Sequence, residues 1–256
     1  MLRGYLFLGV IGLFMLTGDI IQRTLLLLLI WLFPGQRDRI LTRWMYILRR
    51  TGFFIFRRVG GARFEGIPEI PCQPGVLILM NHQSLLDIPV LFLSVTDGYP
   101  LFVAREHYAH WIPAVSHNIR LYGHPRVDPV RFSPRQLDAL RDLAAAAPRP
   151  VAIFPEGTRT KTGDIGRFRT AGLKAILAAR QWAVYLVVGD GMWQSAHLGD
   201  FVRGVRNIRA RFTMTGPFEF PGPDADEEHT EAFIKAMRAR MVEQLQQLRD
   251  DTGTRQ

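Results

Sequence analysis

Two apolar runs at the N-terminus constrain this chain more than any other feature of its sequence. Residues 4–18 and 24–36 carry no charged side chain, and Asp19 and Arg23 lie between them. Neither run reaches the roughly 18 to 20 apolar residues that span a bilayer. One long tilted helix could bury an Asp19–Arg23 ion pair, or two short helices could form a hairpin in one leaflet, turning near residues 17–19. We favour the hairpin, and we expect it to be retained because MLTGDI is a poor signal-peptide cleavage site.

The next segment, residues 37–63, is strongly basic. It holds eight arginines and one acid, and its apolar residues recur at roughly helical spacing, at Ile40, Leu41, Trp44, Met45, Ile47 and Leu48. A basic amphipathic helix after an apolar anchor is typical of a segment that lies on an anionic leaflet. The alternative is a helix that docks on the protein and leaves its basic face in water. We expect residues 1–63 to anchor the protein at a bacterial inner membrane, with its active site on the cytoplasmic side.

The charge of the whole chain also favours an anionic partner. The net charge is +9, although only three of the 32 basic residues are lysines, which indicates a coding bias toward arginine. Nucleic acid, an anionic membrane and a phosphorylated substrate would all suit such a charge. Nucleic acid is not expected here, because nucleic-acid-binding proteins seldom carry an apolar anchor. Cys72 is the only cysteine, so neither an intramolecular disulfide nor a cysteine-rich metal site can form.

From about residue 64 the sequence alternates between strand-like and helix-like segments. Strands are expected at 75–80, 99–105, 149–157 and 183–191, and helices at 85–95 and 170–181. Residues 207–216 alternate in polarity and are expected to form an edge strand. The alternation predicts an α/β fold with a largely parallel sheet flanked by helices, after an N-terminal membrane-associated helical segment. We divide the chain into the anchor, 1–63, and an α/β domain, 64–256.

The last predicted element is an amphipathic helix over residues 224–250. Acidic residues fill its first turn, and an apolar stripe follows at Phe233, Met237, Met241, Leu245 and Leu248. We expect this stripe to pack on the core.

Polar residues follow the first predicted strand of the α/β domain. His82 comes two residues after the strand, and Asp87 lies five residues further on. Ser84 and Asp87 would fit a capping box, but Pro89 would then lose a hydrogen bond and clash inside the helix, so a helix start near Asp87 is favoured. Residues five apart on one continuous helix point about 140° away from each other. A His82–Asp87 contact therefore requires a loop followed by a helix.

A second polar turn follows the strand predicted at 149–157. Glu156, Gly157, Thr158 and Arg159 leave that strand in a turn that contains glycine. Arginine is a forked donor suited to phosphate, and backbone N–H groups in such a turn can add to an anion site. Because chemistry in these sheets gathers at the carboxyl ends of the strands, both polar turns are candidates for one site.

The two turns, NHQSLLD and about 70 residues later FPEGTR, resemble the motifs of the lysophosphatidic acid acyltransferase family. The resemblance covers about residues 65–220 and includes Phe168 and Gly172 in GRFRTAGLKAILAA. It implies acyl transfer from acyl-CoA or acyl carrier protein to a lysophospholipid hydroxyl, with 1-acylglycerol 3-phosphate as the expected acceptor and phosphatidic acid as the product. By the same resemblance, His82 is the general base and Asp87 its orienting partner. The residues implied in binding the acceptor are Glu156, Gly157, Thr158, Arg159 and Arg126, with Arg120 as a rival to Arg126.

The implied chemistry suits these residues. An alcohol that attacks a thioester needs no metal, but its proton must be removed, which histidine does well near neutral pH. A carboxylate can fix the imidazole's tautomer and stabilise its cation. No Gly-x-Ser-x-Gly motif is present, so direct transfer is favoured over a serine acyl-enzyme. No cofactor or metal is expected beyond the acyl donor. The alternatives are a lipid-binding protein of this fold without catalysis, acylation of a different lysolipid, and a hydrolase that uses His82 to activate water.

Overall fold

A six-stranded sheet forms the centre of the computed structural model, which describes residues 2–127, 133–197 and 199–253. Its strands lie in the order β1 (Arg63–Glu65), β8 (Arg209–Phe220), β7 (Trp182–Asp190), β2 (Val76–Met80), β6 (Val151–Ile153) and β3 (Leu101–Phe102). Every neighbouring pair is parallel except β7–β8. The predicted α/β fold with a largely parallel sheet is confirmed.

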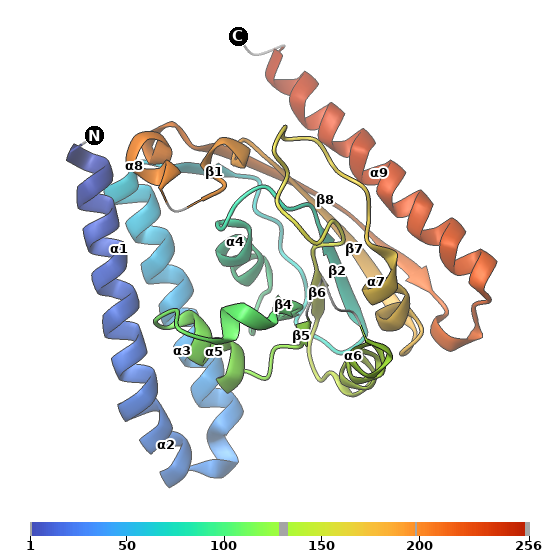
Figure 1. Ribbon diagram of the computed structural model, residues 1–256, viewed down its shortest axis with the longest axis horizontal. Coiled ribbons are helices and arrows are strands. Elements are labelled where there is room, and N and C mark those ends of the chain that lie inside the picture. Colours follow the sequence, from blue (N-terminus) through green and yellow to red (C-terminus); the bar gives the residue numbers. More distant parts are fainter. Residues whose placement is uncertain (1, 128–132, 198, 254–256) are drawn as a thin grey trace.

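The central position of β2 follows from its composition. All five of its residues are apolar and almost fully buried, and a strand can be apolar throughout only when both faces of the sheet are covered. Right-handed crossovers supply the two covers. The connection from β2 to β3 places α4 (Asp87–Ser94) on one face, and the return from β6 to β7 places α7 (Thr170–Leu177) on the other (Figure 1).

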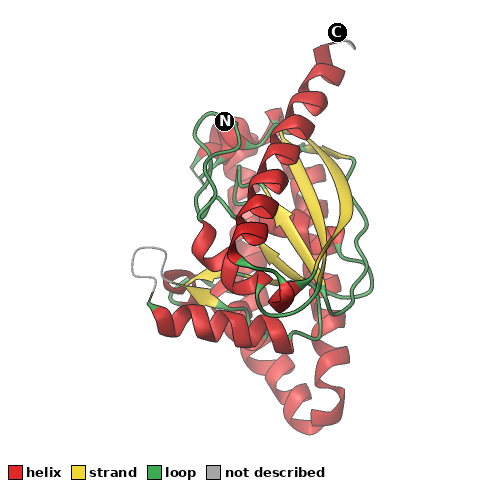
Figure 2. Ribbon diagram, turned by 90° about the vertical axis from the view of Figure 1, so that its right-hand side faces the viewer, coloured by secondary structure: helices red, strands yellow, loops and turns green. Residues whose placement is uncertain are grey.

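The remaining helices and a small second sheet complete the α/β part. α9 (Glu227–Gly253) lies across the strands, as Figure 2 shows, and it packs on α7. Met237, Met241 and Leu245 on α9 are buried, which confirms the predicted core contact. The other elements are α5 (Val115–Leu121), α6 (Pro134–Ala146), α8 (Asp200–Gly204), and the paired strands β4 (Ala104–Arg105) and β5 (Arg126–Val127).

The strand predicted at residues 207–216 is confirmed as β8, but it is not an edge strand over its whole length. β8 pairs with β7 on one side, and β1 covers its other side at Arg209–Arg211. Among the described strands, β8 is therefore open on that side only beyond Arg211. β1 has only three residues, too few for a recognisable alternation, so neither β1 nor its pairing with β8 could be predicted from the sequence.

The N-terminal apolar region forms one continuous helix instead of the predicted hairpin turn at residues 17–19. α1 (Leu2–Ile21), a π-helical turn (Gln22–Leu26) and α2 (Leu27–Leu32) run without a break. The chain turns at residues 33–36, and α3 (Arg37–Phe54), extended by a π-helical stretch to Gly60, returns alongside (Figure 1).

Partners far along the chain explain why the polar interruption does not end the helix. Asp19 pairs with Arg23 at 2.7 Å and also accepts a hydrogen bond of 2.9 Å from the backbone N–H of Ala114. Gln22 is fully buried. Asp19 and Gln22 therefore face the protein, where α5 begins, whereas Arg23 stays exposed, and the helix continues past all three.

One side of this long helix is packed on the rest of the protein. Gly4 lies so close to the carbonyl of Val202 in α8 that no side chain would fit. The Phe7 ring lies 4.9 Å from Phe56 and 5.9 Å from Phe201. Within the described residues, the stretch Leu2–Leu32 is the one helix long and apolar enough to cross a membrane by length and composition. The proposed domain boundary after residue 63 stays a prediction.

The predicted amphipathic helix is confirmed in α3, and its apolar side docks on the protein. Leu41 and Met45 are buried, whereas most of the helix's arginines are exposed. Arg49 is an exception, because its guanidinium donates to the carbonyls of Phe92 and Val95 at 2.9 and 2.7 Å.

Candidate active site

His82 and Asp87 are in direct contact at the carboxyl end of β2. α4 begins at Asp87, which is the late start that Pro89 predicted, and residues 81–86 form the loop before it. His82 Nδ1 lies 2.7 Å from Asp87 Oδ2. The backbone N–H groups of Gln83 and Ser84 donate to the same oxygen at 2.6 and 2.8 Å. The predicted loop-then-helix geometry is confirmed.

This arrangement defines the tautomer of the neutral imidazole. The Asp87 side chain is 1% exposed and accepts three hydrogen bonds through one oxygen, so Nδ1 is the protonated nitrogen when the ring is neutral. Nε2 then carries the lone pair. The ring is stacked on Phe154 with centroids 4.3 Å apart, and 17% of the His82 side chain is exposed. Such an imidazole can accept a proton from a hydroxyl group placed at Nε2.

Glu156 braces the backbone of His82. β6 pairs in parallel with β2, so the loop after β6 lies beside residue 82. Glu156 Oε1 accepts from the His82 N–H at 2.9 Å, and Oε2 accepts from the Gly166 N–H at 2.8 Å. Burial raises the pKa of this carboxyl group, against the lowering effect of both backbone donors. These contacts favour a positioning role for Glu156. The predicted contact with a phosphate is less favoured, because an ionised carboxylate has no hydrogen-bond donor to offer it.

The turn that follows contains the other predicted binding residues. Gly157 has φ +65°, in the left-handed region that favours glycine, and a Cβ there would lie 2.8 Å from Arg169 Cδ. Thr158 is exposed, and the half-buried Arg159 donates to the Ala196 carbonyl. A cleft of about 330 Å³ opens over this turn, lined among others by Thr158, Arg159, Lys161 and Arg167. The lining holds three cations and three threonine hydroxyl groups beside two carboxylates, Glu156 and Asp164, and this excess of cations suits an anionic ligand.

Arg126 and its rival Arg120 are not among the residues that line this cleft. Arg126 lies in β5 and pairs with Glu106 at 3.1 Å, on the exposed surface. Arg120 donates to the Ala109 carbonyl. Their predicted roles as phosphate contacts stay predictions.

The structure adds residues that the sequence reasoning missed. Arg105 ends β4 and donates to the Gly157 carbonyl. It closes the strand predicted at 99–105, so the rule about carboxyl ends of parallel strands could have found it.

Asn81 and Gln83 tie the His82 loop to the end of β7. Asn81 both donates to and accepts from Gly189, at 2.9 and 2.8 Å, and Gln83 Nε2 lies 3.1 Å from Asp190 Oδ1. The only sequence signal for them was their polarity after an apolar strand.

The sequence of the α/β domain matches one protein-family model. Residues 61–188, half of the chain, match the family model described as Acyltransferase, and the chain belongs to that family. This confirms the family that the two motifs indicated.

Two curated relatives carry a more specific name, 1-acyl-sn-glycerol-3-phosphate acyltransferase. The protein from Cocos nucifera is 25% identical over 173 residues, which cover 66% of this chain and 53% of that protein. The protein from Borreliella burgdorferi is 29% identical over 146 residues, which cover 53% of this chain and 54% of that protein. The chain thus spans about half the length of the curated relatives it matches.

A solved structure has the same fold over nearly the whole chain. It is the 1-acyl-sn-glycerophosphate (LPA) acyltransferase PlsC from Thermotoga maritima, with a TM-score of 0.60 and 20% sequence identity. The match covers 96% of this chain and 94% of that one, so the N-terminal helices are part of the shared fold.

Proposed function

We propose that this protein transfers a fatty acyl group from a thioester donor to the free hydroxyl group of a lysophospholipid. The acceptor we assign is 1-acylglycerol 3-phosphate, which gives phosphatidic acid. The observation that carries the proposal is the 2.7 Å contact between His82 and Asp87 beside a cleft that contains Arg159, Lys161 and Arg167. The names of the relatives support the choice of acceptor.

The reaction begins with the acceptor's hydroxyl group at His82 Nε2. The hydroxyl oxygen attacks the thioester carbonyl carbon as Nε2 takes its proton, and the Asp87 carboxylate stabilises the imidazolium that forms. When the tetrahedral intermediate collapses, the carbon–sulfur bond breaks and the imidazolium returns the proton to the leaving thiolate. The products are the ester and a free thiol. Acyl-CoA and acyl carrier protein are both chemically suitable donors, and the scheme needs no other cofactor.

The cations of the cleft hold the acceptor's phosphate in this proposal. Arg159 offers a forked donor, and a charge-assisted hydrogen bond is worth about 1.5 to 3 kcal/mol. Glu156 and Thr160 both hold the backbone of His82. Glu156 accepts from the His82 N–H, and the Thr160 N–H donates to the His82 carbonyl. The backbone of His82 is therefore fixed on both sides while its ring moves a proton.

Membrane association is supported by the exposed side of the long N-terminal helix. Its large exposed apolar residues run from one end to the other: Leu2, Tyr5, Leu6, Leu13, Leu16, Ile20, Leu25, Leu28, Trp31 and Leu32. The opposite side is packed on the protein from Gly4 to Gln22, about 27 Å of helix. A helix that crossed the bilayer upright would carry this protein surface into the hydrocarbon.

We therefore propose that the helix lies along the membrane within one leaflet. Trp111 is 98% exposed, and its loop is tied to the helix through the Asp19–Ala114 hydrogen bond, so it adds an aromatic contact at the lipid interface. The arginines of α3 supply attraction to anionic lipid. On this basis we assign the protein to the cytoplasmic side of a bacterial inner membrane.

An assay of thioester consumption with and without lysophosphatidic acid tests the function. We expect consumption to depend on the acceptor and phosphatidic acid to appear by mass spectrometry. His82→Ala should lower kcat by roughly 10²- to 10⁴-fold, and His229→Ala on α9 is the matched control. Lipid binding without transfer would favour the non-catalytic alternative. Thioester loss that needs no acceptor would favour a hydrolase.

The membrane proposal is tested with two surface leucines. Leu13→Ser with Leu16→Ser removes apolar area from the exposed side and leaves the packed side intact. Wild-type protein should stay on anionic vesicles at high salt, whereas the variant should be released, because salt screens arginine attraction beyond about 8 to 10 Å. Labelling that places Met1 and Arg37 on opposite sides of the membrane would contradict the one-leaflet arrangement.

A further inference from the structure

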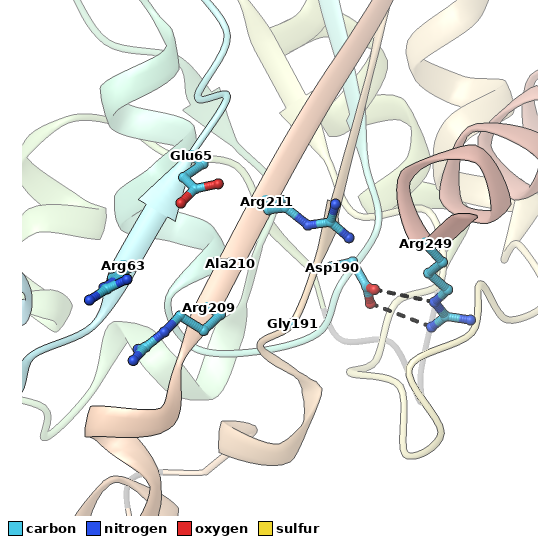
Figure 3. A pocket seen from close by; sticks show the side chains of 8 residues that line it. All are labelled: Arg63, Glu65, Asp190, Gly191, Arg209, Ala210, Arg211 and Arg249. Atoms are coloured by element: carbon cyan, nitrogen blue, oxygen red, sulfur yellow. Dashed lines mark hydrogen bonds and ion pairs between the residues drawn. The ribbon is translucent and has the colours of Figure 1, made fainter. Parts of the chain in front are cut away.

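A second cavity, of about 460 Å³, shares no lining residue with the cleft over residues 156–167. Figure 3 shows its lining side chains, which come from β1, the adjoining ends of β7 and β8, and α9. Four of them are arginines: Arg63, Arg209, Arg211 and Arg249. The carboxylates in the lining are Glu65 and Asp190. We call this cavity the arginine cleft.

The strand register and the ion pairs show which of these side chains lie beside an opposite charge. Glu65 lies directly opposite Arg211 in the β1–β8 register, and Asp190 pairs with Arg249 at 3.2 Å (Figure 3). Arg63, however, lies directly opposite Arg209.

Like charges at paired positions on neighbouring strands repel each other, because the strands are only about 4.8 Å apart. Within the described parts of the chain, neither Arg63 nor Arg209 forms an ion pair with a carboxylate. Among the residues that the structure describes, Arg209 donates to the carbonyls of Arg206 and Ile208. A bound anion between the two guanidinium groups would relieve this repulsion, and guanidinium groups recognise phosphate in a bidentate manner.

A residue that lines the arginine cleft is hydrogen-bonded to the proposed catalytic loop. Asp190, in its wall, accepts from Gln83 Nε2 at 3.1 Å. Gln83 directly follows His82, and its N–H donates to Asp87 Oδ2 at 2.6 Å. A ligand with its charged end in this cleft is therefore adjacent to the loop that carries the base.

We propose that the arginine cleft binds the phosphorylated nucleotide end of an acyl-CoA donor. This assignment rests on the proposed acyl transfer, which needs two substrates, and the cleft over residues 156–167 is assigned to the acceptor. A concave cavity of this volume suits a small phosphorylated ligand, whereas an acidic carrier protein would need a broad surface. Arg63 and Arg209 contact the phosphates, and the flexible pantetheine arm carries the thioester toward His82.

The test compares steady-state kinetics of wild-type protein with the double variant Arg63→Ala/Arg209→Ala. Palmitoyl-CoA and palmitoyl-3′-dephospho-CoA are the two donors, and Arg135→Ala/Arg141→Ala, at two exposed arginines on α6, is the charge-matched control. The KM for palmitoyl-CoA should rise about tenfold to hundredfold in the double variant, for the loss of two charge-assisted contacts. The rise should be smaller with the dephospho donor, which lacks one of the phosphates. The acceptor KM should stay within about twofold.

A direct binding measurement separates the cleft from the proposed function. Coenzyme A itself is titrated into wild-type and variant protein by calorimetry, which needs no turnover. Arginine-dependent binding in a protein that transfers no acyl group would support the cleft and refute the proposed function.

Active protein with an unchanged palmitoyl-CoA KM in the double variant would overturn the cleft assignment and leave the function standing. So would a KM change seen only with palmitoyl-acyl carrier protein, because the ligand would then be a protein. Melting temperatures within about 2 °C of wild type, together with an unchanged acceptor KM, identify a variant that has folded.

Discussion

Asp87→Asn should reduce turnover much less than the corresponding change in a serine-protease triad. There, asparagine leaves the histidine in the wrong tautomer, at a cost of about 10⁴-fold in kcat. Here the orientation of the new amide is determined by two further donors. The N–H groups of Gln83 and Ser84 lie 2.6 and 2.8 Å from Oδ2, so that position requires an acceptor, and the amide oxygen should occupy it. His82 Nδ1 then still donates, and Nε2 keeps its lone pair.

The expected magnitude follows from what the variant does lose. A neutral oxygen replaces a charged one against His82, which removes about 1.5 to 3 kcal/mol of stabilisation from the imidazolium and lowers kcat roughly 10- to 150-fold. The amide NH₂ would take the place of Oδ1, a buried atom without a hydrogen-bond partner among the described residues. Leaving the two N–H donors of this amide unpaired should cost about 1 to 3 kcal/mol of folding free energy and lower Tm by roughly 2 to 10 °C.

The measurement is kcat with saturating palmitoyl-CoA and lysophosphatidic acid, alongside Tm and the kcat of His82→Ala. Asp87→Ala is the informative companion, because it also leaves the Gln83 and Ser84 N–H groups unsatisfied and should destabilise the protein more than asparagine does. A loss for Asp87→Asn as large as that for His82→Ala would refute the argument that the backbone donors set the amide's orientation. Full activity would show that His82 does not depend on the carboxylate.

Three other changes test separate parts of the site and the core. Arg159→Ala should raise the acceptor KM about 10- to 150-fold; a rise confined to the donor KM would move this arginine to the donor side. Glu156→Gln should lower kcat with little effect on the acceptor KM, because an amide NH₂ would face one of the backbone donors that Glu156 now accepts; a selective rise in acceptor KM would instead support phosphate binding. Burial lowers the pKa of His124 to about 3, so the neutral side chain favours folding above pH 6.5, and stability should fall as the pH drops toward 3. Between pH 7 and pH 4, the free energy of unfolding measured with urea should fall by about 3 kcal/mol less in His124→Gln than in wild type. An unchanged pH dependence would contradict a buried, neutral His124.

Local sequence was enough to predict the geometry of the His82 loop, whereas the pairing of His82 with Asp87 was implied by the resemblance of the two motifs. The apolar run of β2 required a buried strand, and Pro89 excluded an early start of α4, so a loop had to carry His82 toward Asp87. Both conclusions depend on residues within a few positions of each other.

The wrong or missing predictions concern contacts between distant parts of the chain. The helix continues through Asp19 because the Asp19 carboxylate accepts a hydrogen bond from Ala114, which lies 95 residues away in the sequence. Arg105 reaches Gly157 across 52 residues, and the role of Glu156 depends on the N–H of His82, 74 residues earlier. Nothing near these residues in the sequence encodes such partners, because the partners come together only through the order of the strands.

That strand order also determines when the site can assemble during synthesis. β2 pairs with β6 and β7, and both emerge from the ribosome after it. The braces of the His82 loop come later still, from Glu156 to Ser195, whose carbonyl accepts from the Ser84 hydroxyl at 2.5 Å. At about 5 to 20 residues per second, the 108 residues from His82 to Asp190 take roughly 5 to 20 seconds to make. During that interval the fully apolar β2 has neither neighbour, while the apolar helix at residues 2–32 is already complete. Contact with a chaperone or with lipid would shield these apolar segments from aggregation, and the site cannot assemble until Ser195 has been translated.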